Sequence, residues 1–224
     1  MKSEVESKSK KSYKGVAMEG FIARFYAKNT KSNMQEYKRF AKQVAENVSD
    51  SSNVLEVAPG PGYLSIELAK LDNYRITGMD ISKTFVEIEK TNAKKAGVKV
   101  DFKQGDASNM PFDNESFDFV VCTAAFKNFT KPIMTLNEMY RVLKPDGKVL
   151  IIDLKRDASK KAINKYVEDM DQNWINTIFT KLTFRFLLRS AYTKAEIKEL
   201  VSHTKFRKCE IPKNPIELAI LLEK

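Results

Sequence analysis

The chain contains 224 residues, of which 42% are hydrophobic and 30% charged, and its formal net charge is +10. Its length and composition suit one globular α/β domain with an appendage. No apolar run of about 18 residues exists and the first residues lack an apolar stretch, so neither a transmembrane helix nor a secretory signal is expected. Two cysteines and one histidine are too few for a disulfide scaffold or a typical zinc site, which predicts a cytoplasmic protein without a metal.

The positive charge is concentrated at the two ends of the chain. Residues 1–14 carry five lysines and two glutamates, and residues 155–224 carry fifteen basic and nine acidic side chains. Only one positive charge is left for residues 15–154. A solvated lysine-rich surface explains this best, while contact with nucleic acid or an anionic membrane stays open.

The predicted elements begin after a basic tail. Residues 1–14, rich in serine and lysine, are predicted to be a disordered tail, and residues 15–224 to form a single domain. Apolar residues at 20–26 predict a short helix or packed arm. A period of 3.6 over 34–48 predicts a helix, and 53–57 reads as a buried strand.

Strand and helix signals then alternate. Beyond a Gly-Pro turn, the predicted order is a helix that carries Leu64, Leu68 and Leu71, a strand at 74–80, a helix at 83–96, strands at 98–102 and 117–122, a helix at 131–143 and a strand at 148–154. This alternation predicts a mostly parallel sheet flanked by helices. Residues 156–192 interrupt it and are predicted to form a helical cap. A helix at 193–203 and two closing strands at 205–211 and 215–222 complete the chain.

The turn after the first strand is the first candidate for ligand binding. Gly60 and Gly62 allow close approach of a ligand to the backbone. Asp80 ends the second strand, where a carboxylate can accept hydrogen bonds from both hydroxyls of a ribose. The acidic Glu56, just before the turn, favours a cationic ligand.

The same turn is poorly suited to a dinucleotide. A G-x-G-x-x-G motif would need glycine where Ser65 stands, and Pro59 and Pro61 lack the N–H donors that hold a pyrophosphate. A ligand without phosphate therefore fits better than NAD(P).

Five motifs together resemble the class I S-adenosylmethionine-dependent methyltransferases. They are Glu56-Val57-Ala58-Pro59-Gly60-Pro61-Gly62, Gly78-Met79-Asp80-Ile81-Ser82, Gly105-Asp106-Ala107-Ser108-Asn109-Met110-Pro111-Phe112, Ser116 through Cys122, and Arg141 through Lys148. Ala58 replaces the more usual first glycine. The resemblance covers residues 50–155. It implies a Rossmann-like class I methyltransferase fold with a seven-stranded sheet, S-adenosyl-L-methionine as cofactor, and no metal.

The resemblance also implies roles for individual residues. Glu56 would orient the methionine amino group, Asp80 would hold the ribose, and Asp106 with Ala107 would read the adenine. The remaining predicted cofactor contacts are Ala58, Pro59, Gly60, Gly62, Ile81, Thr123 and Ala124.

The segment 124–130 resembles the loop of quinone and menaquinone methyltransferases. Lys127 and Asn128 are predicted to hydrogen-bond an acceptor oxygen, and Phe126 to stack on the acceptor. Tyr26 is a further catalytic candidate on an N-terminal arm. In-line attack of a nucleophile on the sulfonium methyl requires positioning above all, because the cofactor carries the reactive group.

The acceptor is predicted to be a small apolar or aromatic molecule beneath the cap at 156–192. A basic amphipathic helix around 175–189, beside Trp174, could instead contact a membrane surface. The alternatives are a methyltransferase acting on RNA or protein, a cofactor-binding protein without catalysis, and an NAD(P) oxidoreductase. Nucleic acid is the less favoured partner, since no Asn/Asp-Pro-Pro-Tyr/Phe tetrapeptide follows the fourth strand. The oligomeric state stays open.

Overall fold

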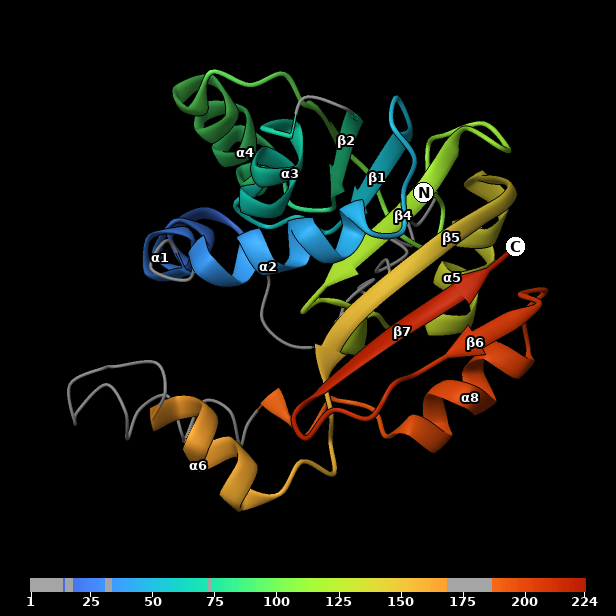
Figure 1. The fold of residues 1–224 in the computed structure, drawn as a ribbon. Coiled ribbons are helices and arrows are strands. Elements are labelled where there is room, and N and C mark those ends of the chain that lie inside the picture. Colours follow the sequence, from blue (N-terminus) through green and yellow to red (C-terminus); the bar gives the residue numbers. More distant parts are fainter. Residues whose placement is uncertain (1–13, 15–17, 31–33, 72–73, 169–186) are drawn as a thin grey trace, which may run out of the picture.

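Seven strands form one sheet in the order β3-β2-β1-β4-β5-β7-β6, drawn as arrows in Figure 1. The computed structural model describes residues 14, 18–30, 34–71, 74–168 and 187–224. The strands are β1 (Asn53–Val57), β2 (Arg75–Asp80), β3 (Asp101–Gln104), β4 (Phe117–Thr123), β5 (Leu143–Leu154), β6 (Lys208–Glu210) and β7 (Glu217–Glu223). The first five pair in parallel, and β7 pairs antiparallel with both β5 and β6. The predicted fold class and the closing hairpin are confirmed.

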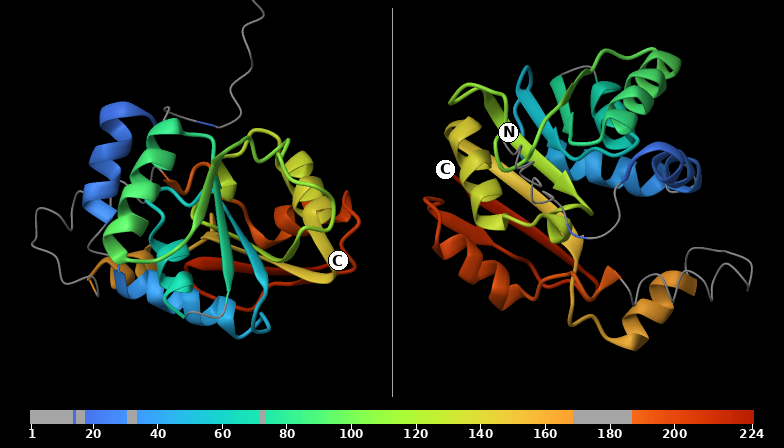
Figure 2. Two further views of the ribbon diagram at one scale, coloured as in Figure 1. Left: turned by 90° about the horizontal axis from the view of Figure 1, so that it is seen from above. Right: turned by 180° about the vertical axis from the view of Figure 1, so that it is seen from behind.

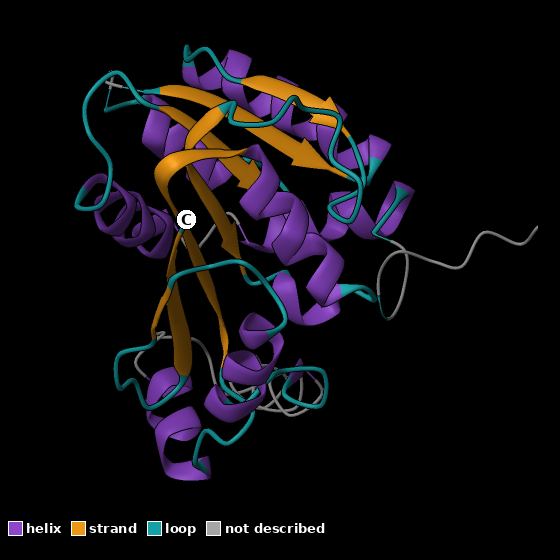
Figure 3. Cartoon of the chain, turned by 90° about the vertical axis from the view of Figure 1, so that its right-hand side faces the viewer, coloured by secondary structure: helices purple, strands orange, loops and turns teal. Residues whose placement is uncertain are grey.

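Helices cover both faces of the sheet (Figure 3). They are α1 (Gly20–Thr30), α2 (Met34–Ala45), α3 (Tyr63–Ala69), α4 (Lys83–Ala96), α5 (Pro132–Val142), α6 (Lys160–Glu168) and α8 (Lys194–Ser202). Apolar side chains of α2 and α3 pack on one face of the central strands, and those of α5 and α8 pack on the other. Because β4 and the second half of β5 are buried on both faces, Phe119–Cys122 and Val149–Ile152 are continuous runs of apolar residues.

The residues that the sequence predicts at the two ends of α4 cap this helix in the structure. The Ser82 hydroxyl accepts a hydrogen bond from the Phe85 N–H at the first turn, and Gly97 ends the helix in the left-handed conformation. This fixes the start of α4 directly behind the end of β2.

Several strand boundaries differ from their predicted positions, most clearly those of β3 and β5, while β6 spans only Lys208–Glu210 of the predicted 205–211. β3 begins at Asp101 rather than residue 98, because Asp101 is the first residue that pairs with β2, opposite Thr77. β5 begins at Leu143 rather than 148 and contains the predicted Lys-Pro-Asp-Gly turn. The pairing with β4 shifts register there, and Asp146 has a φ of 61°, so the turn is absorbed as a bulge.

The chain order reverses between β1 and β4, where connections leave toward opposite faces of the sheet (Figure 2). In open α/β sheets such a point creates a crevice at the carboxyl ends of the strands. The predicted tail lies outside the described residues, except for Lys14. Residues 169–186 of the predicted cap also lie outside them. The described part of the cap includes α6, whose Tyr166 hydroxyl donates to Glu36 of α2 at 2.8 Å.

Candidate active site

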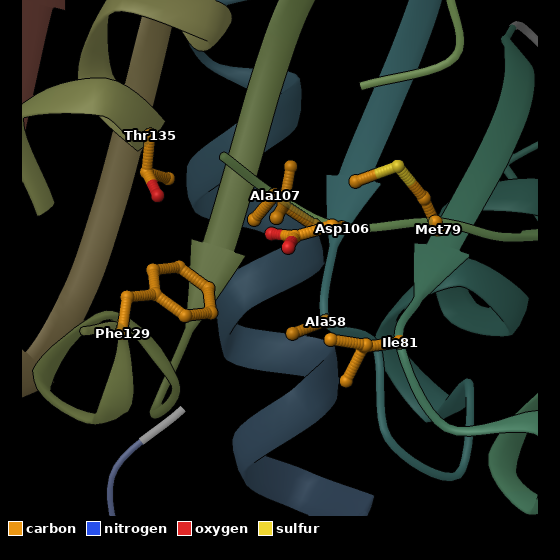
Figure 4. Close-up of a pocket in the computed structure, with 9 residues that line it drawn as sticks. Ala58, Met79, Ile81, Asp106, Ala107, Phe129 and Thr135 are labelled. Atoms are coloured by element: carbon orange, nitrogen blue, oxygen red, sulfur yellow. The ribbon is translucent and has the colours of Figure 1, made fainter. Parts of the chain in front are cut away.

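A hollow that is partly open to solvent lies at the carboxyl ends of β1 and β2 (Figure 4). It is lined by Val57, Ala58, Met79, Ile81, Gly105, Asp106, Ala107, Phe129 and Thr135. Figure 4 shows Phe129 on one side, with Ala58 and Ile81 across from it. Five residues of the predicted site therefore converge here or just beside it: Ala58, Ile81, Asp106, Ala107 and, in the adjoining turn, Gly60.

The turn after β1 is built from left-handed residues. Ala58, Gly60 and Gly62 have φ values of 57°, 59° and 77°. A Cβ on Gly60 would meet only the Tyr26 ring, at 3.9 Å, so the backbone there is open to a ligand. A Cβ on Gly62 would lie 3.2 Å from both Glu89 Cγ and Phe102 Cζ. Its φ of 77° and its close packing against α4 and Phe102 both favour glycine at position 62.

Glu56 does not face the hollow. It is 1% exposed, and its Oε2 accepts a 2.5 Å hydrogen bond from the Ser65 hydroxyl of α3. Burial raises the pKa of Glu56 to about 7, although the hydrogen bonds from Ser65 act in the opposite direction. This carboxyl holds the start of α3 in place under the glycine turn.

Asp80 connects the two predicted cofactor motifs. Its Oδ2 accepts the Gly60 N–H at 3.2 Å and its Oδ1 accepts the Ser82 N–H at 2.8 Å. Burial raises its pKa to about 6. Lone pairs of both oxygens remain beyond these two bonds, so the carboxylate can also accept hydroxyl donors.

Asp106 and Ala107 lie in the loop after β3. The Asp106 Oδ1 accepts the Ser108 N–H at 2.8 Å and the Ser108 hydroxyl at 2.9 Å. These bonds orient the carboxylate at the edge of the hollow, where Ala107 contributes apolar surface.

Hydrogen bonds to the starts of α4 and α3 hold helix α1 and the preceding Glu19 beside the glycine turn. Glu19 accepts hydrogen bonds at the start of α4 from Lys83 N (2.9 Å), Thr84 N (3.2 Å) and the Thr84 hydroxyl (2.6 Å). Burial acts to raise the Glu19 pKa, but these bonds outweigh it and lower the pKa. Farther along, the Tyr63 hydroxyl donates to the Ala27 carbonyl at 2.9 Å. The Tyr26 ring therefore lies beside Gly60, 3.9 Å from where a Cβ on that residue would be, and it packs edge-on against Phe85.

We predict that Glu19→Gln weakens S-adenosylhomocysteine binding about three- to tenfold, because the amide keeps one acceptor but loses the charge that favours a helix N-terminus. Calorimetry with the full chain measures this change. Glu46→Gln, beyond the end of α2, serves as the control. Equal affinity in the Glu19 variant and the wild type would show that α1 does not support the cofactor site.

Tyr26 is positioned at the turn but is a poor base. Although 39% of Tyr26 is exposed, desolvation by its neighbours, with smaller contributions from Glu36 and Asp153, raises its pKa, so the phenol stays protonated and can donate a hydrogen bond.

Lys127 occupies a different environment from the one its sequence position suggested. It is 2% exposed, and its Nζ lies 2.7 Å from Asp153 Oδ1. The ammonium points into the protein between the ends of β4 and β5. Asn128 is half-buried beside it, and its carbonyl accepts the Lys14 N–H at 2.5 Å. Removing one partner of a buried ion pair costs about 3–5 kcal/mol because the other charge is left uncompensated.

Three buried acids lie close to the glycine turn on its protein side: Glu56, Asp80 and Glu89. Glu89 is 0% exposed, and both its carboxylate oxygens are without a hydrogen-bond partner. Burial, reinforced by Asp80 and Glu56, raises its pKa to about 10. Glu89 is therefore a neutral carboxylic acid at physiological pH.

The comparisons with known proteins agree with this geometry. Residues 55–151 match the family model described as "Methyltransferase domain". A demethylmenaquinone methyltransferase from Staphylococcus haemolyticus is 26% identical over 219 residues, covering 92% of this chain and 90% of that protein. Residues 55–151 therefore carry a methyltransferase domain that is similar to those of the class I S-adenosylmethionine-dependent enzymes.

Solved structures show the same fold for this methyltransferase. A protein from Methanococcus maripaludis, assigned as an S-adenosyl-L-methionine-dependent methyltransferase, has a TM-score of 0.78 at 19% identity and covers 96% of this chain and 97% of its own. The plantazolicin methyltransferase BpumL, in complex with a substrate analogue and S-adenosylhomocysteine, has a TM-score of 0.66 at 17% identity, with 90% of each chain covered. S-adenosyl-L-methionine is the cofactor.

The site of this methyltransferase fits that cofactor. The open backbone at Gly60 gives a ligand room against the turn. Asp80 ends β2, and Asp106 follows β3 and lines the hollow, whose other lining residues are mostly apolar. Thr123 ends β4, and Ala124 follows as an exposed residue with a φ of 56°. Pro59 and Pro61 are buried, with the Pro61 carbonyl accepting Asn92 Nδ2 at 2.9 Å.

Sequence reasoning missed three acidic residues of this methyltransferase. Asp153 carried a usable signal, because an acid closing a buried apolar strand must find a partner. Glu89 stands among the buried positions of α4, where helical periodicity could have singled it out. Glu19 had no local signal, since its partners are 64 and 65 residues away.

Within the residues that the structure describes, no helix is long and apolar enough to cross a membrane, and no group of His, Cys, Asp or Glu side chains could hold a metal ion. Trp174 and most of the predicted basic helix at 175–189 lie outside this part of the chain.

Proposed function

We propose that this methyltransferase acts on a small acceptor with an apolar or aromatic ring, and that the acceptor meets the cofactor beside residues 124–129. The observation that carries this proposal is the Phe129 ring, which lines the hollow across from the predicted cofactor residues Ala58 and Ile81. An acceptor that packs on such a ring needs apolar or aromatic surface of its own.

The aromatic residues next to the hollow support the same class of acceptor. Phe129 lines the hollow, and its ring packs edge-on against Phe126 with centroids 5.9 Å apart. Phe126 in turn contacts the Tyr192 ring at 5.8 Å. Phe126 is 1% exposed, so Phe129 rather than Phe126 is available to contact an acceptor.

The relatives favour a quinone-like acceptor. The Staphylococcus haemolyticus protein is named for demethylmenaquinone, an aromatic ring system that the apolar wall at Phe129 would suit. We therefore choose demethylmenaquinone, in its reduced form, as the first acceptor to test. The cytoplasmic location and the membrane contact derived from composition stay predictions.

The cofactor, when bound, supplies an electrophilic methyl group on a sulfonium. The chain's own residues bind and orient it: Asp80 would hold the ribose hydroxyls, Asp106 and Ala107 the adenine, and the turn at Gly60 the methionine end. Glu56 supports this turn from below through Ser65. Positioning of this kind supplies a large part of the rate of a bimolecular transfer.

The acceptor's nucleophilic atom is not stabilised by Lys127 in this proposal, because the Lys127 ammonium is bound by Asp153. Asn128 and Tyr26 remain as candidate hydrogen-bond partners for the acceptor. The comparisons lend no support to an NAD(P) oxidoreductase or to methylation of RNA or protein.

A labelling experiment tests the proposal. The full chain is incubated with methyl-labelled S-adenosylmethionine and separate cell fractions: organic-extractable metabolites, aqueous metabolites, RNA and protein. Label is expected in the organic-extractable fraction and on added demethylmenaquinol. Asp80→Ala is the inactive control. Label in RNA or protein that falls steeply with salt would contradict the proposal.

A further inference from the structure

A closed ring of hydrogen bonds joins the end of β4 to the end of β5. The Asp153 carboxylate accepts Lys127 N at 2.8 Å, Lys127 Nζ at 2.7 Å and Leu154 N at 2.8 Å. Lys127 Nζ also donates to the Ala124 carbonyl at 2.5 Å, and Ala124 N donates to the Ile152 carbonyl at 2.8 Å. The Asp153 carboxylate, the Lys127 ammonium and both peptide groups of Ala124 each have a partner within the protein, and the Lys127 and Asp153 side chains are only 3% and 5% exposed.

The ring holds a strained piece of backbone. Ala124 has a φ of 56°, a conformation that an L-residue with a Cβ adopts at a cost. Its N–H is bound to β5 and its carbonyl to the Lys127 ammonium, so both its peptide groups are fixed. The surrounding contacts must determine this conformation, because the residue itself does not favour it.

The strained residue begins the segment that faces the acceptor. We call residues 124–129 the acceptor wall. From Ala124 the chain enters the short 3-10 helix Phe126–Asn128, and Phe129 then lines the hollow. In Figure 4 the Phe129 ring lies opposite Ala58, across the hollow. A shift at Ala124 would therefore move Phe129 and Asn128 with it.

Stability alone does not explain a buried ion pair at this place. Taking both charges out of water opposes folding, and apolar residues of similar volume often replace such pairs without loss of stability. Geometry is a better explanation, since an ammonium can bind a carboxylate and a carbonyl together, which an apolar side chain cannot do.

We propose that Lys127 and Asp153 are positioning residues that fix the acceptor wall against the cofactor site, and that neither touches the acceptor. This inference rests on the proposed function. It predicts that methyl transfer depends on the ring even where folding and cofactor binding do not.

The test compares Lys127→Met, Asp153→Leu and the double variant, each in the full chain. Lys127→Met leaves the Asp153 charge buried without a partner, so its Tm should fall markedly. The double variant removes both charges, and its Tm and its Kd for S-adenosylhomocysteine should return close to those of the wild type, the Kd within about threefold. Its kcat should nevertheless stay 10- to 100-fold low with an unchanged pH profile, because small misplacements of a reactant have effects of this size.

The control is a second ion pair that involves a buried carboxylate, Lys70 with Glu67, at the far end of α3. The variant Lys70→Met/Glu67→Leu should keep full turnover. If turnover in the Lys127/Asp153 double variant recovers together with its Tm, the pair has only a structural role. If the double variant loses one limb of the pH profile, Lys127 takes part in proton transfer. Either result overturns the inference.

A second readout needs no acceptor and separates failure of this inference from failure of the proposed function. In a chain labelled with ¹³C-methyl alanine, the double variant should show broadened or doubled methyl signals for Ala124 and Ala125, with the signal of Ala41 in the core unchanged. A single sharp Ala124 signal at the wild-type position would overturn the inference, whatever the acceptor. A wild-type protein that methylates no small molecule would contradict the proposed function instead.

Discussion

Replacing Asp80 by asparagine is expected to raise the Kd for S-adenosylhomocysteine about 100-fold. Each hydrogen bond to a charged group contributes about 1.5 kcal/mol at the low end, and two ribose hydroxyls would bind this carboxylate, which gives about 3 kcal/mol or two decades. The asparagine amide would also turn a donor toward Gly60 N or Ser82 N, which Asp80 now binds as an acceptor. Calorimetry on the full chain measures the change.

The same variant carries a pH signature. Because burial raises the Asp80 pKa to about 6, the carboxylate becomes protonated below this pH and loses acceptor capacity. Wild-type affinity should be constant above about pH 7 and fall up to tenfold per pH unit well below 6, and this limb should be absent from Asp80→Asn. Asp101→Asn, at the exposed start of β3, is the matched control. An unchanged Kd in Asp80→Asn would refute the ribose role.

Replacing Glu89 by glutamine is expected to stabilise the protein, and to do so more strongly as the pH rises. In the unfolded chain this acid has a pKa of about 4.3, whereas in the folded protein burial raises it to about 10. Between these values unfolding releases a proton, so the wild-type free energy of unfolding falls by up to about 1.4 kcal/mol per pH unit as pH rises. Glutamine has no proton to release.

Thermal unfolding from pH 5.5 to 8.5 measures this difference, which should widen by at most about 4 kcal/mol over the three pH units. The contributions of Glu56 and Asp80 have the same sign and are present in both proteins, so the comparison isolates Glu89. Glu87→Gln, on the exposed side of the same helix, should run parallel to the wild type. Parallel curves for Glu89→Gln would mean that its carboxyl is ionised in the folded state.

The fold was largely predictable because its signals are local. The cap at Ser82, the stop at Gly97 and the apolar runs of β4 and β5 each act within a few residues. The start of β5 could not be predicted from local signals. The Lys-Pro-Asp-Gly segment becomes a bulge of this strand only because the strand pairs with β4.

The site residues also fall into those that local sequence signals predict and those that depend on distant partners. The positions of Gly60, Asp80 and Asp106 follow from strand ends, which the sequence marks. The burial of Lys127 does not, because its partner Asp153 is 26 residues away on another strand. Likewise, the inward orientation of Glu56 depends on Ser65 of the following helix.

The contact between Glu19 and α4 has a consequence for competition inside a cell, where adenine nucleotides share their adenosine with the cofactor. Phosphate groups bind readily to free N–H groups at helix starts. Here the Lys83 and Thr84 N–H groups are taken by the Glu19 carboxylate, and Gly60 N is taken by Asp80. Residues 59 and 61 are prolines without an N–H. A phosphate at the start of α4 would thus meet N–H groups that are already occupied and a carboxylate of its own charge. The start of α4 therefore disfavours phosphate groups, and this effect does not depend on the contacts of the adenine.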